Sequence, residues 1–288
     1  MAKVALIIPF YCQTKNLGKV LAGLEKQTTK PDTIFIVVDR PEDDPEYGNT
    51  FQSIVDKSAL NINVIKSTNP KHIGNRPDEG KTLFLAPHVR NQGIDKALKS
   101  GHDAFIFIDG DCVPQPTLIE SHLKKLSSNV PVMSIGRRRE KQYRWMDRRE
   151  FESNLCHLEI FREHGMIVNN PELLKNSLIV WSCNVGMNAK AVKLLRNFNK
   201  KYYSRYEVFC SEFNGKWGGE DGFLGIEAWH CRIFITTLGE RGSGIEHIDH
   251  PRPSDVYSIS HKEFFDKEMS ALRTKVQISP LDLNFFNV

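Results

Sequence analysis

The chain has 288 residues, of which 40% are hydrophobic and 26% are charged, and its formal net charge is +4. No stretch is long and apolar enough to cross a bilayer, and the first ten residues lack the cleavage pattern of a signal peptide. The six cysteines form no CxxC pair and no framework spacing, so we expect reduced thiols in a cytoplasmic protein of one large domain or two small ones.

The first half of the chain alternates short apolar runs with helical periodicity. We expect strands at residues 4–9, 33–39, 62–65 and 105–108. Helical spacing separates them, with Leu17, Val20, Leu21 and Leu24 on one face, then Phe51, Ile54 and Val55, then residues 83–98 with Pro87 interrupting the start. This alternation predicts a Rossmann-like, mainly parallel sheet with right-handed crossovers and flanking helices.

The second half is less regular. A helix carrying Leu118, Ile119, Leu123 and Leu126 leads to a strand at 130–135, and further strands are expected at 178–185 and 233–237. A helix with Phe223, Leu224, Ile226 and Trp229 lies between the last two. Residues 67–80 are rich in proline, glycine and charge, which predicts a flexible loop.

Two carboxylates, Asp109 and Asp111, follow directly on the strand at 105–108 and are separated only by Gly110. In open α/β sheets, ligands bind at the carboxyl ends of strands. Two carboxylates so close together suit a hard divalent cation shared with a phosphate. The plainer interpretation is an Asp-Gly turn, which uses the same residues for loop geometry alone.

A second acidic pair, Glu220-Asp221, follows Trp217-Gly218-Gly219 at the start of a predicted helix. A carboxylate in this position can remove a proton from an acceptor hydroxyl, and the glycines let the acceptor approach closely. Trp217 offers a flat face for stacking. The alternative is a helix N-cap, which acidic residues favour without any catalysis.

Together these motifs resemble those of family 2 glycosyltransferases of the A-type fold. The match, which covers roughly residues 3–250, runs in order through Pro9-Phe10-Tyr11, Asp39, Arg90-Asn91-Gln92-Gly93-Ile94-Asp95-Lys96-Ala97, Asp109 with Asp111, and Gly218-Gly219-Glu220-Asp221. Each motif is weak alone, but five in order are a strong signal.

The resemblance implies a division of the chain and a set of site residues. Residues 1–136 would form the nucleotide-sugar-binding half, 137–255 the acceptor-binding and catalytic half of the same domain, and 256–288 a C-terminal helix and tail. The implied nucleotide-sugar ligands are Pro9, Tyr11, Asp39, Arg90, Asp109 and Gly110. Mn²⁺ or Mg²⁺ would be held by Asp111, Asp109 and His247, with His250 as a competitor of His247.

The resemblance also implies an activity: inverting transfer of a sugar, hexose or pentose, from a UDP-sugar to an acceptor hydroxyl. Asp221 would be the base, and Glu220 would bind the acceptor or the donor sugar. The sequence departs from the family pattern at two places, which affects the expected contacts with the base and the ribose. Glu227 stands where the family commonly has an arginine, and Arg40-Pro41 follows Asp39 in place of a second aspartate and Gly-Ser.

The acceptor is the open part of this interpretation. Residues 137–149 hold seven basic side chains with Tyr143 and Trp145 among them. Acceptor contacts are expected at Trp217, Gly219, Arg138 and Arg144. A saccharide or glycoconjugate acceptor is favoured. The alternative is viral-type glycosylation of a hydroxymethylated DNA base, for which a basic, aromatic groove and base flipping would be needed.

Two further classes of protein share some of these features. A non-catalytic carbohydrate- or nucleic-acid-binding module would not need Asp111 and Asp221 together. A sugar-nucleotide pyrophosphorylase would carry a glycine-rich loop after its first strand, and Pro9-Phe10-Tyr11-Cys12-Gln13 contains no glycine. The oligomeric state has no signature in the sequence.

Overall fold

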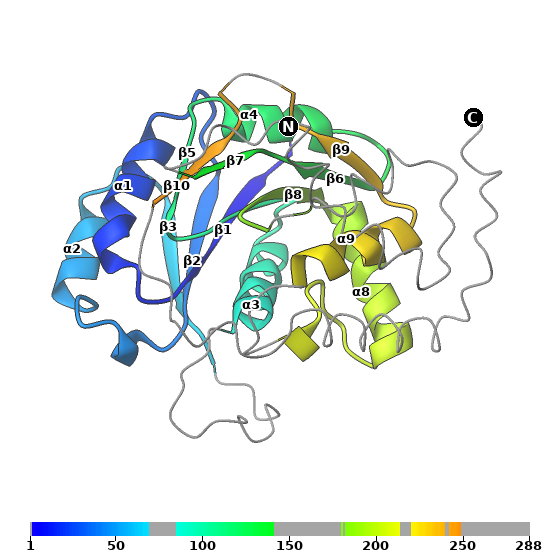
Figure 1. Ribbon diagram of the computed structural model, residues 1–288, viewed down its shortest axis with the longest axis horizontal. Coiled ribbons are helices and arrows are strands. Elements are labelled where there is room, and N and C mark those ends of the chain that lie inside the picture. Colours follow the sequence, from blue (N-terminus) through cyan, green and yellow to red (C-terminus); the bar gives the residue numbers. More distant parts are fainter. Residues whose placement is uncertain are drawn as a thin grey trace.

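A computed structural model of the chain describes residues 2–68, 85–140, 180, 182–213, 220–239 and 242–248. Its main sheet has seven strands in the order β3-β2-β1-β4-β8-β6-β9 (Figure 1). The first four are parallel: β1 (Val4–Phe10), β2 (Thr33–Val38), β3 (Ile62–Lys66) and β4 (Ala104–Ile108). Strand β8 (Asn184–Asn188) runs antiparallel between β4 and β6 (Val132–Ile135), and β9 (Phe234–Thr237) pairs with β6 in parallel.

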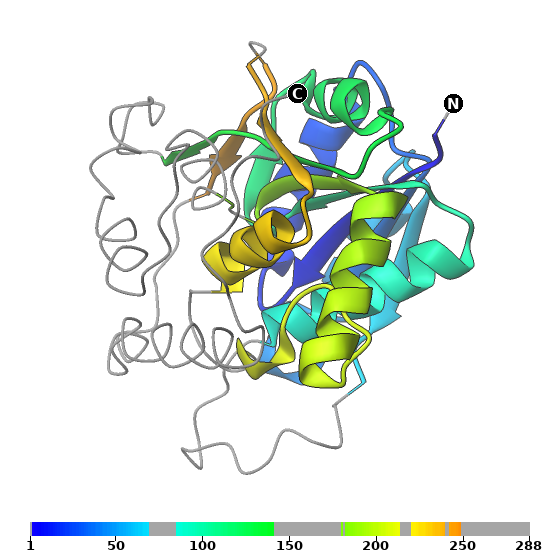
Figure 2. The ribbon, with the colours of Figure 1, turned by 90° about the vertical axis from the view of Figure 1, so that its right-hand side faces the viewer.

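Helices cover both faces of this sheet. On one face lie α1 (Thr14–Glu25), α2 (Asn49–Asp56) and α4 (Leu118–Leu126), which pack on a core that includes Leu6 and Ile8 of β1. On the other lie α3 (Ala86–Lys99), α8 (Ala189–Tyr203) and α9 (Glu220–His230), and Figure 2 shows α8 and α9 side by side there. Because both faces are covered, the central strands are apolar throughout and show no alternation.

A second, three-stranded sheet includes the strand that follows the turn after β4. It consists of β5 (Cys112–Pro114), β10 (Ile245–His247) and β7 (Arg138–Glu140), with β10 in the middle. Two single-turn helices, η1 (Pro41–Asp43) and η2 (Ser211–Phe213), follow β2 and the loop after α8. No helix among the described residues has the length and apolarity that a membrane span requires.

The predicted fold class is confirmed, with corrections to individual elements. The strand expected at 178–185 is instead at Asn184–Asn188, because the buried face of this strand continues through Met187 and ends at Asn188, which caps α8 with its side chain. The sequence interpretation did not include α8 or the three-stranded sheet. Helix α3 begins at Ala86, and Pro87 lies in its first turn rather than interrupting it. Backbone N–H groups in the first turn of a helix have no intrahelical acceptor, so a proline there removes no helical hydrogen bond.

Helix α3 approaches the sheet closely at Gly93. A Cβ atom placed there would lie 2.5 Å from Cγ2 of Ile7 on β1 and 3.3 Å from Cγ2 of Val37 on β2. The glycine of the Arg-Asn-x-Gly motif therefore brings α3, and with it Arg90 and Asn91, against the carboxyl half of the sheet.

We expect Gly93→Ala to lower the free energy of unfolding by about 1–3 kcal/mol, because the added methyl group forces α3 away from a packed core. Gly18→Ala is the matched control: it lies within α1, and a Cβ atom there meets nothing within 4 Å. That variant should be more stable than the wild type by about 0.5–1 kcal/mol. Urea unfolding followed by circular dichroism measures both, and equal effects of the two substitutions would contradict the close packing of α3.

Candidate active site

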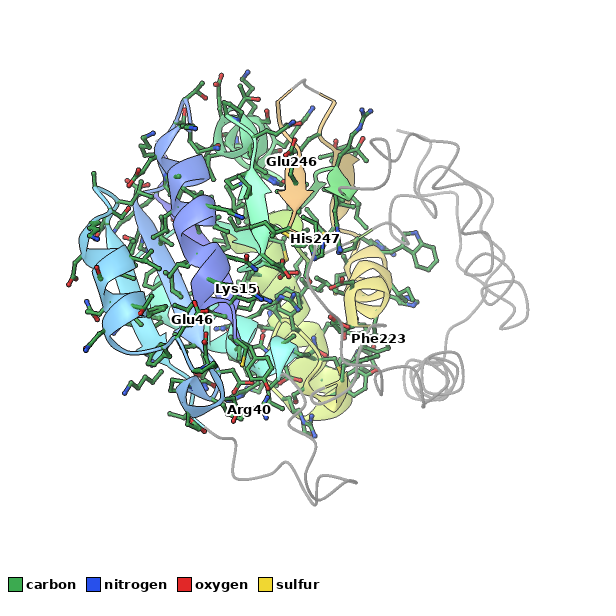
Figure 3. The ribbon with its side chains drawn as sticks, turned by 60° about the vertical axis from the view of Figure 1, so that its left-hand side comes forward. Lys15, Arg40, Glu46, Phe223, Glu246 and His247 are labelled. Atoms are coloured by element: carbon green, nitrogen blue, oxygen red, sulfur yellow. The ribbon has the colours of Figure 1, made fainter. Side chains whose placement is uncertain are left out.

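The three-stranded sheet brings His247 to the Asp109-Gly110-Asp111 turn. Strand β10 pairs antiparallel with β5, so that His247 lies opposite Cys112, and the Ile248 N–H donates to the Asp111 carbonyl at 2.7 Å. Nε2 of His247 is 3.4 Å from Oδ2 of Asp111, and Figure 3 shows His247 at the end of β10. Two of the three predicted metal ligands are thus adjacent. His250 lies outside the described residues.

Asp109, the third predicted ligand, is held by Arg90 of α3. Nη2 of Arg90 donates to Oδ1 of Asp109 at 3.0 Å, and Nη1 lies 3.6 Å from Oε1 of Glu220 at the start of α9. The Arg90 side chain is only 3% exposed, and its Cζ lies 5.4 Å from the centre of the Phe209 ring. One buried guanidinium therefore joins the Asp-x-Asp turn to the late acidic pair, two motifs more than a hundred residues apart in the sequence.

Asn91, the next residue of the same motif, fixes the loop that follows α8. Its Oδ1 accepts the N–H groups of Val208 and Phe209, each at 3.0 Å, and its Nδ2 donates to the Phe209 carbonyl at 2.7 Å. Phe209 is consequently positioned against Arg90. Sequence reasoning did not single out Phe209, since nothing in its neighbourhood marks it, but the conformation of its loop follows from Asn91.

The carboxyl groups around Arg90 have perturbed protonation equilibria. Burial raises the pKa of Asp109, an effect that Arg90 opposes and that the nearby Asp111 charge reinforces. Burial, together with the neighbouring Asp221, raises the pKa of Glu220 to about 8, although Arg90 again acts in the opposite direction. Glu220 therefore keeps its proton near neutral pH and can donate a hydrogen bond.

This pKa predicts a pH-dependent stability. From the ordinary glutamate value of 4.5 up to about 8, the folded protein binds a proton that the unfolded chain has lost. The free energy of unfolding should therefore decrease as the pH rises through this window. Glu220→Gln should flatten the dependence, whereas the exposed Glu120→Gln should leave it unchanged, because the pKa of Glu120 is lowered by Thr28 and Lys124 and that group titrates below the window. Urea unfolding at about pH 5 and about pH 8 tests this, and an unaltered slope in Glu220→Gln would contradict it.

Glu220 and Asp221 begin α9 and each have one buried oxygen without a hydrogen-bond partner in the described structure. These are Oε2 of Glu220 and Oδ1 of Asp221. A buried acceptor without a donor is costly unless a ligand supplies the donor. Both residues lie in the first turn of the helix, where acidic side chains are favoured, but this placement leaves the two oxygens without a donor. Trp217 and Gly219 lie outside the described residues.

The donor atoms at the Asp-x-Asp turn fit a divalent cation. Carboxylate oxygens with one imidazole suit Mn²⁺ better than Mg²⁺, which prefers oxygen alone. Among the described residues, the group whose three ligand atoms all lie within 4.8 Å of one another is Asp109, Cys112 and Cys183, whereas the predicted set of Asp109, Asp111 and His247 is not so compact. Both thiols are buried, and burial raises the pKa of Cys112 well above its usual value, so its sulfur stays protonated and donates to Oδ1 of Asp111 at 3.2 Å. A protonated thiol is a poor metal ligand.

The residues expected to bind the nucleotide lie at the carboxyl ends of β1 and β2. Pro9 lies in β1, opposite Val37 and beyond Ile7, the last residue paired with β4. Oδ2 of the buried Asp39 accepts the Leu85 N–H at 3.2 Å. The Tyr11 hydroxyl donates to Oδ2 of Asp43 at 3.2 Å. A Cβ atom at Gly110 would lie 3.1 Å from the Phe10 ring, so a larger residue there would require the ring to shift by a few tenths of an ångström.

Of the four predicted acceptor contacts, only Arg138 lies among the described residues. Arg138 is half-buried on β7, in register with Ile245 of β10 and two positions from the pair of Glu140 with His247. Arg144 and the rest of the basic run from residue 141 lie outside the described residues, as does the expected tail at 256–288. Of the proposed halves, the second contributes β8 and β9 to the same sheet as the first.

Comparison with known proteins supports the fold. No protein-family model and no curated protein matches the sequence. Among solved structures, one that is similar is S. aureus TarS 1–349 in complex with UDP-GlcNAc. The match covers 97% of this chain and 68% of the TarS chain, with a TM-score of 0.57 and 14% identity. In another structure of S. aureus TarS, the match covers 99% of this chain and 46% of the TarS chain, with a TM-score of 0.52 and 14% identity.

A second similar structure is glucosyl-3-phosphoglycerate synthase from Mycobacterium tuberculosis with Mg²⁺ and UDP. The match covers 96% of this chain and 80% of the synthase chain, with a TM-score of 0.53 and 12% identity. The protein described here therefore has the fold of the A-type glycosyltransferases, a mainly parallel sheet with flanking helices.

Proposed function

We propose that the protein is an inverting, metal-dependent glycosyltransferase that moves a sugar from a UDP-sugar to a hydroxyl of a saccharide or glycoconjugate. The observation that carries the proposal is the Arg90 bridge, which holds Asp109 of the Asp-x-Asp turn and Glu220 of the late acidic pair around one site. A binding module would not require this joining of two acidic motifs. The similar structures, solved with UDP-GlcNAc or with UDP and Mg²⁺, support the choice of donor and of a divalent cation.

In this proposal the residues around the turn receive the diphosphate. Asp111, His247 and Asp109 would hold Mn²⁺ or Mg²⁺, which would neutralise the charge that develops on the leaving phosphate oxygens. Arg90 positions Asp109. At the other end of the donor, Pro9, Tyr11 and Asp39 would contact the nucleoside, whereas Gly110 would contact the donor at the turn itself.

The transfer itself requires a base. Oδ1 of Asp221 would accept the proton of the acceptor hydroxyl as its oxygen attacks the anomeric carbon. The bond from that carbon to the diphosphate breaks as the new glycosidic bond forms, and a single displacement inverts the configuration. Glu220, protonated near neutral pH, would donate a hydrogen bond to the acceptor or the donor sugar. Trp217, Gly219, Arg138 and Arg144 remain the proposed acceptor contacts.

The release of UDP tests this function. Purified protein with Mn²⁺ would be incubated with UDP-glucose or UDP-GlcNAc and with a saccharide panel, plain DNA or hydroxymethylated DNA. Release stimulated by saccharides, and lost in Asp221→Asn, is the expected result. Stimulation by hydroxymethylated DNA alone would replace the proposed acceptor, whereas no release with any donor and acceptor would contradict the enzymatic function.

A further inference from the structure

Arg40 is the residue at the nucleotide end of the site whose position the proposed function does not yet explain. It follows Asp39 directly at the end of β2 and precedes η1, and Figure 3 shows it at the opposite end of the site from His247. Its backbone is left-handed, with φ 42° and ψ 70°. An L-residue rarely adopts this conformation, because its Cβ atom then lies too close to the backbone. The chain therefore maintains an unfavourable backbone conformation at this arginine.

The Arg40 side chain is buried but only partly satisfied. It is 5% exposed, and Nε, Nη1 and Nη2 all lack a hydrogen-bond partner. Nε lies 3.5 Å from Oδ2 of Asp39, and Nη1 lies 3.4 Å from Oδ2 of Asp43. Both contacts are ion pairs at the outer limit of hydrogen-bonding distance. Neutralising the neighbouring carboxylates requires only a positive charge. A guanidinium also brings five N–H donors, and burying these donors without acceptors costs free energy.

Tyr11 and Asp43 hold the guanidinium in place. Cζ of Arg40 lies 4.6 Å from the centre of the Tyr11 ring, and the Tyr11 hydroxyl donates to the same Asp43 oxygen that pairs with Arg40. The planar group is thus fixed beside the carboxylate of Asp39. In the described part of the chain, both contacts of that carboxylate involve Oδ2. The site presents a fixed acceptor next to fixed, unused donors.

This pattern matches one edge of uracil. In uracil the N3–H donor lies between two carbonyl oxygens, whereas cytosine has an acceptor at N3 and an amino group at C4. Burial raises the pKa of Asp39 above its ordinary value, and the Leu85 N–H and the adjacent Arg40 charge oppose this effect. In its ionised form the carboxylate can accept from N3–H.

We propose that Arg40 is a specificity-determining residue for the base of the donor: its guanidinium donates to the O4 carbonyl oxygen of uracil while Asp39 accepts from N3–H. This inference rests on the proposed function, since it concerns the nucleotide of the same UDP-sugar site. Cytosine would meet Asp39 with its N3 acceptor and Arg40 with its amino donor, so both groups would oppose it.

Isothermal titration of UDP and CDP in the presence of Mn²⁺ tests the proposal. The wild type should bind UDP at least about tenfold more tightly than CDP, because a base with the wrong edge leaves buried polar groups unpaired. Arg40→Lys keeps the charge but lacks the planar fork, and Arg40→Met lacks both. Each should weaken UDP by about tenfold and leave CDP nearly unchanged, so that the preference largely disappears.

The control is Lys15→Met, which removes an exposed positive charge from the first turn of α1 in the same region (Figure 3). It should leave the ratio of the two dissociation constants unchanged. Circular dichroism and the melting temperature confirm that each variant is folded. If the Arg40 variants do not fold, wild-type binding of 3-methyluridine and 4-thiouridine diphosphates replaces them, and both should bind more weakly than UDP.

The outcomes separate this inference from the proposed function. Wild-type protein that binds no nucleoside diphosphate contradicts the proposed function itself. Wild-type protein that binds UDP and CDP equally, or an Arg40→Lys variant that keeps the full preference for UDP, overturns the role of Arg40 and leaves the proposed function intact.

Discussion

Asp221→Asn is expected to reduce the rate of sugar transfer by about 10²–10⁴-fold, the usual contribution of a general base. The asparagine has nearly the same shape as the aspartate but cannot accept a proton from the acceptor hydroxyl. Because Asp221 is proposed to act on the acceptor, the affinity for UDP should change little. Initial rates of UDP release at saturating donor and titration of UDP by calorimetry measure the two quantities separately.

Asp56→Asn serves as the control for Asp221→Asn, since Asp56 is exposed at the end of α2 and only accepts a hydrogen bond from Gln52. It should retain the wild-type rate. An Asp221→Asn variant with an unreduced rate would transfer the role of the base to another group. A variant that lost UDP affinity and rate together would place Asp221 in donor binding.

Arg90→Met is expected to lower the free energy of unfolding by about 3–5 kcal/mol. The substitution removes a buried cation and leaves Asp109 and Glu220 without their shared partner. The pKa values of Asp109 and Glu220, already raised by burial, should rise further because Arg90 no longer opposes that effect. The loss should consequently be smaller at about pH 5, where both carboxyls hold protons more readily, than at about pH 8.

Two comparisons make the Arg90 experiment specific. Lys124→Met breaks an exposed pair with Glu120 and should cost no more than about 0.5 kcal/mol. A triple variant, Arg90→Met with Asp109→Asn and Glu220→Gln, removes the two ionisable carboxyl groups that the single variant leaves without a partner, and it should recover part of the lost stability. Urea unfolding at both pH values measures these differences. A single variant as stable as the wild type would contradict a structural role for the bridge.

Much of the parallel half of the sheet could be predicted from the sequence. Residues 4–9, 33–39, 62–65 and 105–108 were expected as strands, and β1 to β4 occupy nearly the same positions. Buried parallel strands are apolar along their whole length, and this is a local signal that needs no partner. Residues 178–185 carry the same apolar signal, but the bounds predicted from it were wrong. Strand β8 begins at Asn184 and continues over Gly186 and Met187.

The short strands could not be predicted in the same way. Strands β5, β7 and β10 have three residues each, too few for a period of two to be visible. They exist because β10 returns from far along the chain to pair with β5 and β7. The position of His247 beside Asp111 depends on that pairing. The spacing of His247 and His250 in the sequence left the choice between them open.

The sequence by itself determined the alternation of strands and helices, the carboxylates at the strand ends and the order of the motifs, since each of these is written in neighbouring residues. Only the tertiary structure decided which distant groups meet. The Arg90 bridge to Glu220, the placement of His247 on Asp111 and the buried position of Arg40 beside Asp39 and Tyr11 all arise from packing of segments remote in sequence or from a backbone turn. Ion pairs and orphaned polar atoms depend on distance and burial, which no local pattern specifies.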